Sequence, residues 1–135
     1  PVGGFSIENT ERPQLFIGSG VGMTPLVSMF KKAASLNVPT QMIQAVVTED
    51  ERPFAQKLDS ITDNYEQAQL HLHVKDKEGY LEAKELEQYL SEQPEIYICG
   101  GTKFLHSIIN SLKELNYDMN HVHFETFIPR LSVQV

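Results

Sequence analysis

The sequence predicts a doubly wound, three-layer α/β/α domain in which a five-stranded parallel sheet of order 3-2-1-4-5 lies between two layers of helices. Two observations predict this fold class. Short runs of branched and apolar residues alternate five times with amphipathic stretches, and right-handed crossovers between such strands most simply produce this order. The two segments richest in glycine each follow a strand candidate and precede a helix candidate. That arrangement is typical of the point where the winding of such a sheet reverses direction.

The five strand candidates are short and rich in branched side chains, and they cover residues 15–17, 42–47, 70–74, 96–99 and 122–124. The first and the fourth are nearly continuous apolar runs, as expected of central strands buried on both faces. In the third and the fifth, histidines alternate with apolar residues, namely His71, His73, His121 and His123. This alternation indicates strands nearer the edges of the sheet.

Four helix candidates lie between the strands. The first has Thr24 as N-cap and Pro25 at the first helical position, where the missing N–H costs nothing, and Asn37 and Pro39 close it. The second covers about residues 54–61, and a weaker third covers residues 83–90. In the last, which begins at Thr102, apolar residues repeat at helical spacing until residue 116.

Composition indicates a single globular domain. The 135 residues, 41% of them hydrophobic, can fill one core. A formal charge of -7 without a basic cluster argues against nucleic acid or an anionic membrane surface as a partner. The charge also has a simpler interpretation, because a solvated acidic surface keeps a cytosolic domain soluble. No apolar run approaches the roughly 20 residues of a membrane span, and no signal peptide is recognisable, so we expect a cytoplasmic protein. With one cysteine, Cys99, no internal disulfide can form.

The two glycine-rich segments carry the first indication of function. Residues 18–25 read Gly-Ser-Gly-Val-Gly-Met-Thr-Pro, and residues 99–102 read Cys-Gly-Gly-Thr. Glycine lets the backbone approach a ligand closely, and the free N–H groups at a helix N-terminus attract anions. The first segment therefore suits a pyrophosphate. Its spacing is Gly-x-Gly-x-x-Pro rather than the Gly-x-Gly-x-x-Gly of ordinary Rossmann dehydrogenases.

Three motifs in this order resemble the ferredoxin-NADP reductase superfamily, and within it the flavohemoglobins. They are Gly-Val-Gly-Met-Thr-Pro-Leu at residues 20–26, Tyr-Ile-Cys-Gly-Gly at residues 97–101 and His-Phe-Glu-Thr-Phe-Ile-Pro at residues 123–129. The final Glu-x-Phe-x-Pro favours flavohemoglobins over the other members. Residues 1–5, Pro-Val-Gly-Gly-Phe, resemble the segment with which their flavin domain closes. The resemblance implies that residues 1–12 are the tail of an upstream flavin-binding domain with a connector, and that residues 13–135 form an NAD(P)-binding domain.

The resemblance also implies an activity. NAD(P)H would pass a hydride to FAD held mainly by the upstream domain, and electrons would pass on to the haem of a globin domain of the same chain. The complete protein would be a nitric oxide dioxygenase that oxidises nitric oxide to nitrate with O2. The 135-residue chain alone would be inactive because half of the hydride-transfer site would be missing.

Site residues are carried over from the matching motifs alone. The dinucleotide would be bound by Gly20, Val21, Gly22, Met23, Thr24 and Pro25, and the nicotinamide would lie near Cys99 and Gly100. FAD would be contacted by Thr126, Phe127, Ile128 and Pro129. The catalytic residues would be Cys99, Glu125, which would stabilise the transfer site, and Phe127, which would cover the isoalloxazine ring.

The chain departs from the family pattern at three positions. Gly101 stands where proline is usual, Gly4 where aspartate is common, and Ile128 where flavohemoglobins usually have glycine. None of these changes removes a group that does chemistry. Residues 79–81, Gly-Tyr-Leu, fall where the family has a Gly-Arg-Ile-like turn, and no function is carried over to them.

Coenzyme preference is predicted from charge. After the second strand the chain reads Thr-Glu-Asp-Glu at residues 48–51. The carboxylates of Glu49 and Asp50 have the wrong charge for the 2′-phosphate of NADPH, whereas a carboxylate can accept hydrogen bonds from a free ribose. We therefore expect NADH to be preferred, although Arg52 could offset the repulsion and the acidic loop could touch neither coenzyme.

Each assignment has an alternative. Cys99 could be a small core residue, Phe127 an ordinary core aromatic and Glu125 a solvated carboxylate.

The function of the chain also has alternatives. The chain could belong to another flavin-dependent reductase, one that serves an oxygenase or a ferredoxin, or it could be a non-catalytic nucleotide-binding module. A hydrolase is not supported because the chain has no Gly-x-Ser-x-Gly elbow. No metal is expected at the histidine pairs, because no nearby carboxylate or cysteine completes a plausible set of ligands and the pairs belong to strands on opposite sides of the predicted sheet.

Overall fold

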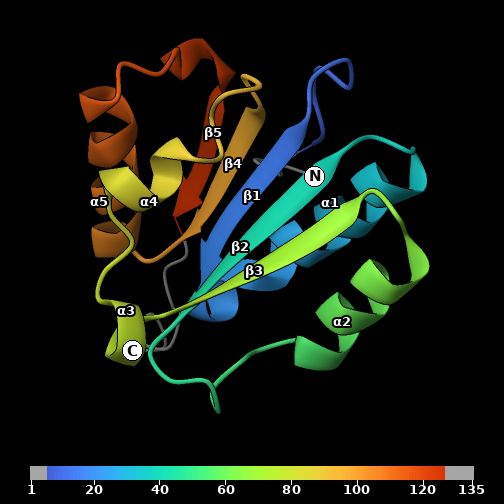
Figure 1. Ribbon diagram of the computed structural model, residues 1–135, viewed down its shortest axis with the longest axis horizontal. Helices are drawn as coiled ribbons and strands as arrows, with labels where there is room; N and C mark the ends of the chain where they lie inside the picture. Colours follow the sequence, from blue (N-terminus) through green and yellow to red (C-terminus); the bar gives the residue numbers. More distant parts are fainter. Residues whose placement is uncertain (1–5, 127–135) are drawn as a thin grey trace, which may run out of the picture.

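The computed structural model describes residues 6–126 of the chain. Five parallel strands form one sheet of order β3-β2-β1-β4-β5 (Figure 1). Their bounds are β1 Gln14–Ser19, β2 Thr40–Val46, β3 Ala68–Val74, β4 Glu95–Gly100 and β5 Val122–Thr126. The predicted fold class and strand order are confirmed. As predicted, the strands with alternating histidines, β3 and β5, lie at the two edges.

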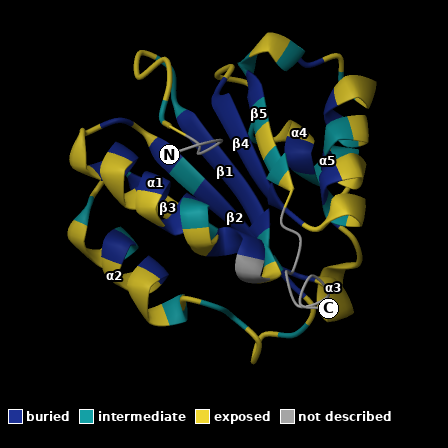
Figure 2. Cartoon of the chain, turned by 180° about the vertical axis from the view of Figure 1, so that it is seen from behind, coloured by how far each residue is buried: buried dark blue, intermediate teal, exposed yellow. Residues whose placement is uncertain are grey.

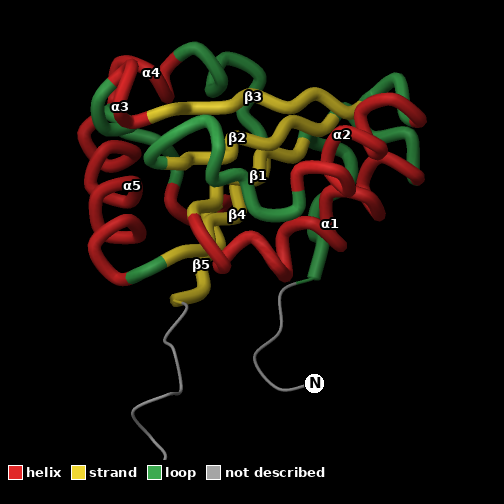
Figure 3. Tube along the Cα trace, turned by 90° about the horizontal axis from the view of Figure 1, so that it is seen from below, coloured by secondary structure: helices red, strands yellow, loops and turns green. Residues whose placement is uncertain are grey.

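Helices cover both faces of the sheet, which gives the three layers visible end-on in Figure 3. On one face, α1 (Met23–Ser35) and α2 (Ala55–Asn64) pack their apolar sides on Phe16, Met42 and Tyr97. On the other face, α4 (Ala83–Glu87) and α5 (Thr102–Glu114) cover the branched side chains of β1, β2 and β4. The central strands are therefore buried on both sides, as Figure 2 shows. Burial of each large apolar side chain contributes roughly 1.5–3 kcal/mol.

The start of α1 differs from the prediction. A 3-10 turn, η1 (Gly20–Gly22), comes first, and Gly22 rather than Thr24 is the N-cap of a helix that begins at Met23. Gly22 already has helical dihedral angles, with φ -63° and ψ -10°. The helix therefore starts before Thr24, the residue whose side chain was predicted to cap it. Pro25 consequently occupies the third helical position. It still lies in the first turn, where the N–H groups have no partner within the helix.

Two further helix bounds also differ. α2 continues to Asn64, three residues past the predicted end, whereas α4 ends at Glu87 rather than at residue 90. A single-turn helix, α3 (Lys75–Glu78), was not predicted because its four residues are all charged and show no apolar periodicity. A short 3-10 turn, η2 (Met119–His121), precedes β5, with Asp118 accepting a hydrogen bond from the backbone N–H of Asn120. Among the described residues, no helix is long and apolar enough to cross a membrane.

A buried polar cluster ties the segment before β1 to the sheet. The carboxylate of Glu95, which is 0% exposed, accepts hydrogen bonds from His121 Nδ1 at 2.9 Å and His123 Nε2 at 2.5 Å. Asn9 also donates to it at 3.1 Å, and Arg12 Nε lies 3.5 Å away. A carboxylate therefore lies beside the histidine pair of β5, a contact that the sequence did not indicate. The partner was missed because Glu95 precedes β5 by a whole helix in the sequence.

Candidate functional site

The two glycine-rich segments meet at the carboxyl ends of the central strands. β1 and β4 are neighbours in the sheet, with Gly18 in register with Cys99. β1 leads through η1 into α1 on one face, and β4 leads through Gly101 into α5 on the other. The winding of the sheet therefore reverses between these two strands, as predicted, and their following loops lie side by side.

Contact between the two loops depends on glycine. A Cβ atom on Gly22 would lie 2.8 Å from the Cα of Gly100 and 2.9 Å from its backbone nitrogen. A Cβ on Gly100 would lie 2.8 Å from the hydroxyl oxygen of Ser19 and 2.7 Å from the ring of Phe104. Side chains at these positions would hold the loops apart. The glycines therefore serve close approach of backbone to backbone as well as any approach to a ligand.

Two features of the loops favour an anion. Gly20 has φ +56°, a left-handed conformation that glycine adopts readily, and a Cβ there would meet nothing within 4 Å. Open space therefore lies directly against the backbone. The helices that follow, α1 and α5, have no acidic side chain in the first turn and no side-chain hydrogen bond at the N-cap. Their N-terminal N–H groups and positive dipole ends suit a pyrophosphate.

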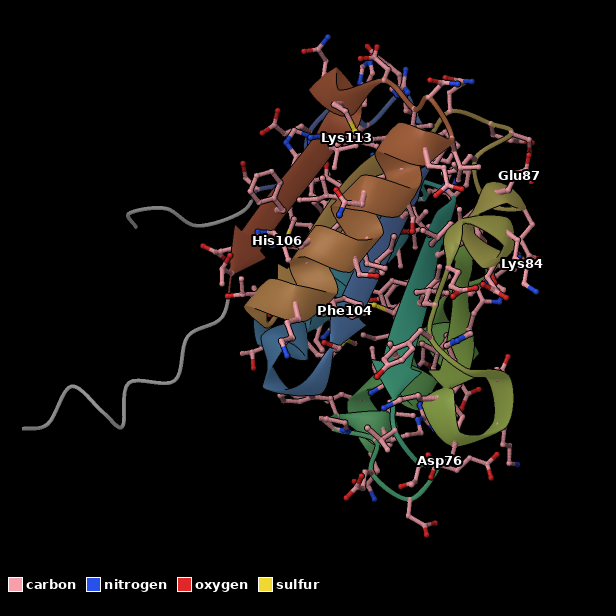
Figure 4. All side chains as sticks on the ribbon, turned by 90° about the vertical axis from the view of Figure 1, so that its left-hand side faces the viewer. Asp76, Lys84, Glu87, Phe104, His106 and Lys113 are labelled. Atoms are coloured by element: carbon pink, nitrogen blue, oxygen red, sulfur yellow. The ribbon has the colours of Figure 1, made fainter. Side chains whose placement is uncertain are left out.

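A cavity of about 440 Å³ opens beside these loops at the carboxyl ends of β1, β2 and β3. Its volume is within the range of small-molecule sites, and its walls are mostly apolar with a few charged groups at the rim. Figure 4 shows Phe104, in the first turn of α5, and Asp76, on α3, at this same end of the molecule. The residues that line the cavity are Ser19, Gly20, Ala45, Val46, Val47, Glu51, Pro53, His73, Lys75, Gly79, Tyr80, Leu81 and Phe104.

The predicted dinucleotide-binding residues are brought together here, but they do not all offer side chains. Gly20, Val21 and Gly22 form η1. The side chain of Met23 is buried in the core beneath Gly18, so the backbone N–H is the group that Met23 can offer. Thr24 is exposed and Pro25 is partly buried.

Cys99 and Glu125 lie next to each other, at the carboxyl ends of β4 and β5, as partners in register. Cys99 is 2% exposed. Burial, with a smaller contribution from the negative charge of Glu125, raises the pKa of the Cys99 thiol to about 11. The thiol is therefore neutral at physiological pH and is a poor nucleophile. Thr126 ends β5 and is exposed, whereas Phe127, Ile128 and Pro129 lie outside the described residues.

The charged residues after β2 differ in their contacts. The carboxylate of Glu49 accepts a hydrogen bond from Lys77 Nζ at 2.9 Å, and Glu49 does not line the cavity. Glu51 does line it. The guanidinium of Arg52 donates to Gln44 at 3.2 Å and to Asp59 of α2 at 3.0 Å, so it is held against α2. The acidic loop borders the cavity through Glu51, and the predicted contact of Glu49 with the ribose stays a prediction.

Sequence reasoning missed the cavity wall formed by His73, Lys75, Tyr80 and Phe104. One signal was available: Gly79 follows four charged residues and precedes an aromatic residue, a pattern typical of a turn. Phe104 gave no separate signal, because it also fits the apolar side of a helix.

Comparisons with known proteins agree with this geometry. Residues 16–109 match the oxidoreductase NAD-binding domain family. Flavohemoprotein B of Dictyostelium discoideum is 28% identical over 98% of this chain, and the reductase subunit of glycine betaine monooxygenase from Chromohalobacter salexigens is 28% identical over 94%. The chain spans 35% and 39% of the lengths of these two relatives.

A solved structure shows the same fold. The flavohem-like FAD/NAD-binding domain of nitric oxide dioxygenase from Vibrio cholerae superposes with a TM-score of 0.75 at 24% identity, covering 93% of this chain and 54% of that one. The family match extends from β1 into α5 and includes both glycine-rich loops. The chain belongs to the oxidoreductase NAD-binding domain family.

Proposed function

We propose that this chain is the NAD(P)H-binding part of a flavohemoglobin-type nitric oxide dioxygenase. The observation that carries the proposal is the meeting of the Gly22 and Gly100 loops where the sheet changes its winding direction, next to a cavity of about 440 Å³. Similarity to a flavohemoprotein along 98% of this chain supports the choice of system.

The residues present fit a dinucleotide laid across the carboxyl ends of the strands. The pyrophosphate lies against the open backbone at Gly20 and the N–H groups at the start of α1. The adenosine half occupies the cavity between β2, β3 and the turn at Gly79. The nicotinamide end lies toward Cys99 and Gly100, on the other side of the loop contact. NADH, when bound, supplies the hydride.

Two side chains act at the nicotinamide end. Cys99 offers a small, neutral thiol, because burial keeps the pKa of this group at about 11. Glu125, its partner in register, places a carboxylate at the same end of the sheet, where its negative charge favours an oxidised, positively charged ring. These roles rest on the resemblance of the surrounding motifs to the family and on the adjacency of the two residues.

The C-terminal motif completes the proposal. Thr126, Phe127, Ile128 and Pro129 contact FAD, with Phe127 over the isoalloxazine ring. Residues 1–12 lead from the upstream FAD-binding domain, and a globin domain of the same cytoplasmic protein holds the haem. The relative from Dictyostelium discoideum, of which this chain spans 35%, supports such upstream domains.

NADH is the proposed coenzyme. The support is the acidic loop at residues 48–51, in which Glu51 brings a carboxylate to the wall of the cavity. A carboxylate at the adenosine end repels a 2′-phosphate and can accept a hydrogen bond from a free ribose hydroxyl.

The test is made on the full-length protein, purified and examined by absorbance and by turnover. We expect bound flavin and haem, together with consumption of nitric oxide that depends on NADH and O2. A flavin spectrum without haem would instead favour an oxygenase reductase, a system to which the relative from Chromohalobacter salexigens belongs. A protein with neither cofactor would be a nucleotide-binding module.

A further inference from the structure

The outer wall of the cavity is a short turn that follows β3. At Gly79 the chain has φ 78° and ψ -167°, a conformation that only glycine adopts without strain. The next residue, Tyr80, lines the cavity although it is 67% exposed. The ammonium group of Lys75 lies 4.5 Å from the centre of the Tyr80 ring. An aromatic ring is therefore held at the rim of a mostly apolar cavity, with a cation over the ring.

One buried imidazole holds this turn. His73, near the end of β3, is 7% exposed and lines the cavity. Its Nε2 lies 2.9 Å from the carbonyl oxygen of Gly79, so the ring donates a hydrogen bond to the backbone of the turn. Its Nδ1 lies 3.7 Å from the carboxylate of Glu78, which in turn accepts a hydrogen bond from the backbone N–H of Val74. Both nitrogens of His73 thus face the segment that carries Tyr80.

Two backbone hydrogen bonds of this segment do not involve the carbonyl oxygen of Gly79. The backbone N–H of Asp76 donates to the carbonyl oxygen of Val47 at 3.1 Å, which fixes the start of α3 to the end of β2. The N–H of Gly79 closes the single turn of α3 on Lys75 at 2.8 Å. Neither bond holds the Gly79 carbonyl, whose direction is coupled to the position of the next residue.

We infer that His73 is a positioning residue for the adenosine half of the coenzyme. Its hydrogen bond to the Gly79 carbonyl fixes the Tyr80 ring as the surface on which the adenine packs. A flat, exposed ring binds a nucleobase more tightly when the ring is ordered before binding, because less conformational entropy is lost. This inference rests on the proposed function, since it requires the adenosine of NAD(P)H in the cavity.

The experiment measures binding of 5′-AMP to the full-length protein by calorimetry, together with KM and kcat for NADH oxidation. In His73→Leu, which cannot donate to Gly79, the Kd for 5′-AMP should rise roughly tenfold, and the effect on NADH should fall on KM rather than kcat. His73→Gln, whose amide can donate to the same carbonyl, should restore most of the affinity. Tyr80→Leu should weaken binding as much as His73→Leu.

The double variant separates positioning from independent contacts. Because His73 acts through Tyr80, the His73→Leu and Tyr80→Leu double variant should bind no more weakly than Tyr80→Leu alone. The matched control is His71→Leu on the same strand. His71 binds Gln41 at 2.7 Å and contacts Tyr89, outside the cavity, so its loss should leave 5′-AMP binding unchanged.

Three results would overturn the inference. They are an unchanged Kd in His73→Leu, an additive loss in the double variant, or an equal loss in His71→Leu accompanied by a lowered Tm. Failure of the proposed function is a different result: the unsubstituted protein would then bind neither 5′-AMP nor NADH.

Discussion

Gly22 faces Gly100 so closely that a methyl group on Gly22 would lie 2.8 Å from the Cα atom of Gly100. The atoms of Gly100 that this methyl group would meet, Cα and N, belong to the backbone, which cannot move aside as a flexible side chain can. The contact joins the loop after β1 to the loop after β4, and thus fixes the two halves of the candidate site relative to each other. A pair of glycines that looks in the sequence like a phosphate-binding signal is also a packing requirement.

We predict that Gly22→Ala lowers the free energy of unfolding by about 1–3 kcal/mol, because the loops must separate to admit the methyl group. The measurement is urea denaturation followed by circular dichroism. Gly101→Ala is the matched control, because a Cβ there would meet nothing within 4 Å and φ is -68°. Equal stability of the two variants would show that the loops tolerate separation.

Stability should also depend on the charge of Glu95. Burial opposes ionisation of this carboxyl, but hydrogen bonds from His123, Asn9 and His121 outweigh burial and hold the pKa of Glu95 below its usual value of 4.5. A carboxyl group whose pKa is lower in the folded state than in the unfolded state stabilises the fold at pH values above its unfolded pKa. This contribution should be lost as the pH falls from about 4.5 through the folded pKa.

Glu95→Gln tests this expectation. At neutral pH the variant should be less stable by about 2–4 kcal/mol, because the charge-assisted hydrogen bonds to the buried carboxylate are lost. Its stability should also fall less steeply than that of the unsubstituted protein between about pH 5 and about pH 3. Glu92→Gln, at an exposed position in the loop before β4, is the control. Parallel pH profiles of the Glu95 variant and the unsubstituted protein would contradict the prediction.

The thiol of Cys99 should be unreactive. Because burial raises the pKa of Cys99 to about 11, almost none of the thiol is ionised near neutral pH, and the thiolate is the reactive form. Alkylation by iodoacetamide should therefore be slow in the folded protein and rapid after unfolding in urea. The readout is mass spectrometry over time. Rapid labelling of the folded protein would mean that Cys99 is accessible and ionised.

Coenzyme preference should depend more on Glu51 than on Glu49. Glu51 lines the cavity, whereas Glu49 is bound by Lys77. In the full-length protein, Glu51→Gln should shift the ratio of kcat/KM values toward NADPH by roughly tenfold, since a carboxylate near a phosphate dianion costs on the order of 1–3 kcal/mol after screening. Glu49→Gln is the matched control. The assignment of Glu51 fails if both variants shift the ratio equally.

Local patterns in the sequence determined the five strands, their order and the two glycine-rich loops. These features follow from side-chain periodicity and turn residues within short windows, and from the handedness of the crossovers between strands. The motifs at residues 20–26 and 97–101 could therefore be placed at the same end of the sheet before their contact was known. Residues 127–129 lie outside the described part of the chain, so their predicted contact with FAD remains a prediction.

Only the tertiary structure decided which side chains meet across these elements. Glu95 binds His121 and His123 although α5 separates them in the sequence, and His73 meets Gly79 across a helix of four charged residues without apolar periodicity. Glu51 reaches the cavity while Glu49 pairs with Lys77, because the path of the loop after β2 sets the direction of each carboxylate. The physical reason is the distance along the sequence over which each kind of interaction acts. Secondary structure depends on neighbouring residues, whereas these contacts depend on strand register and loop geometry over the whole sheet.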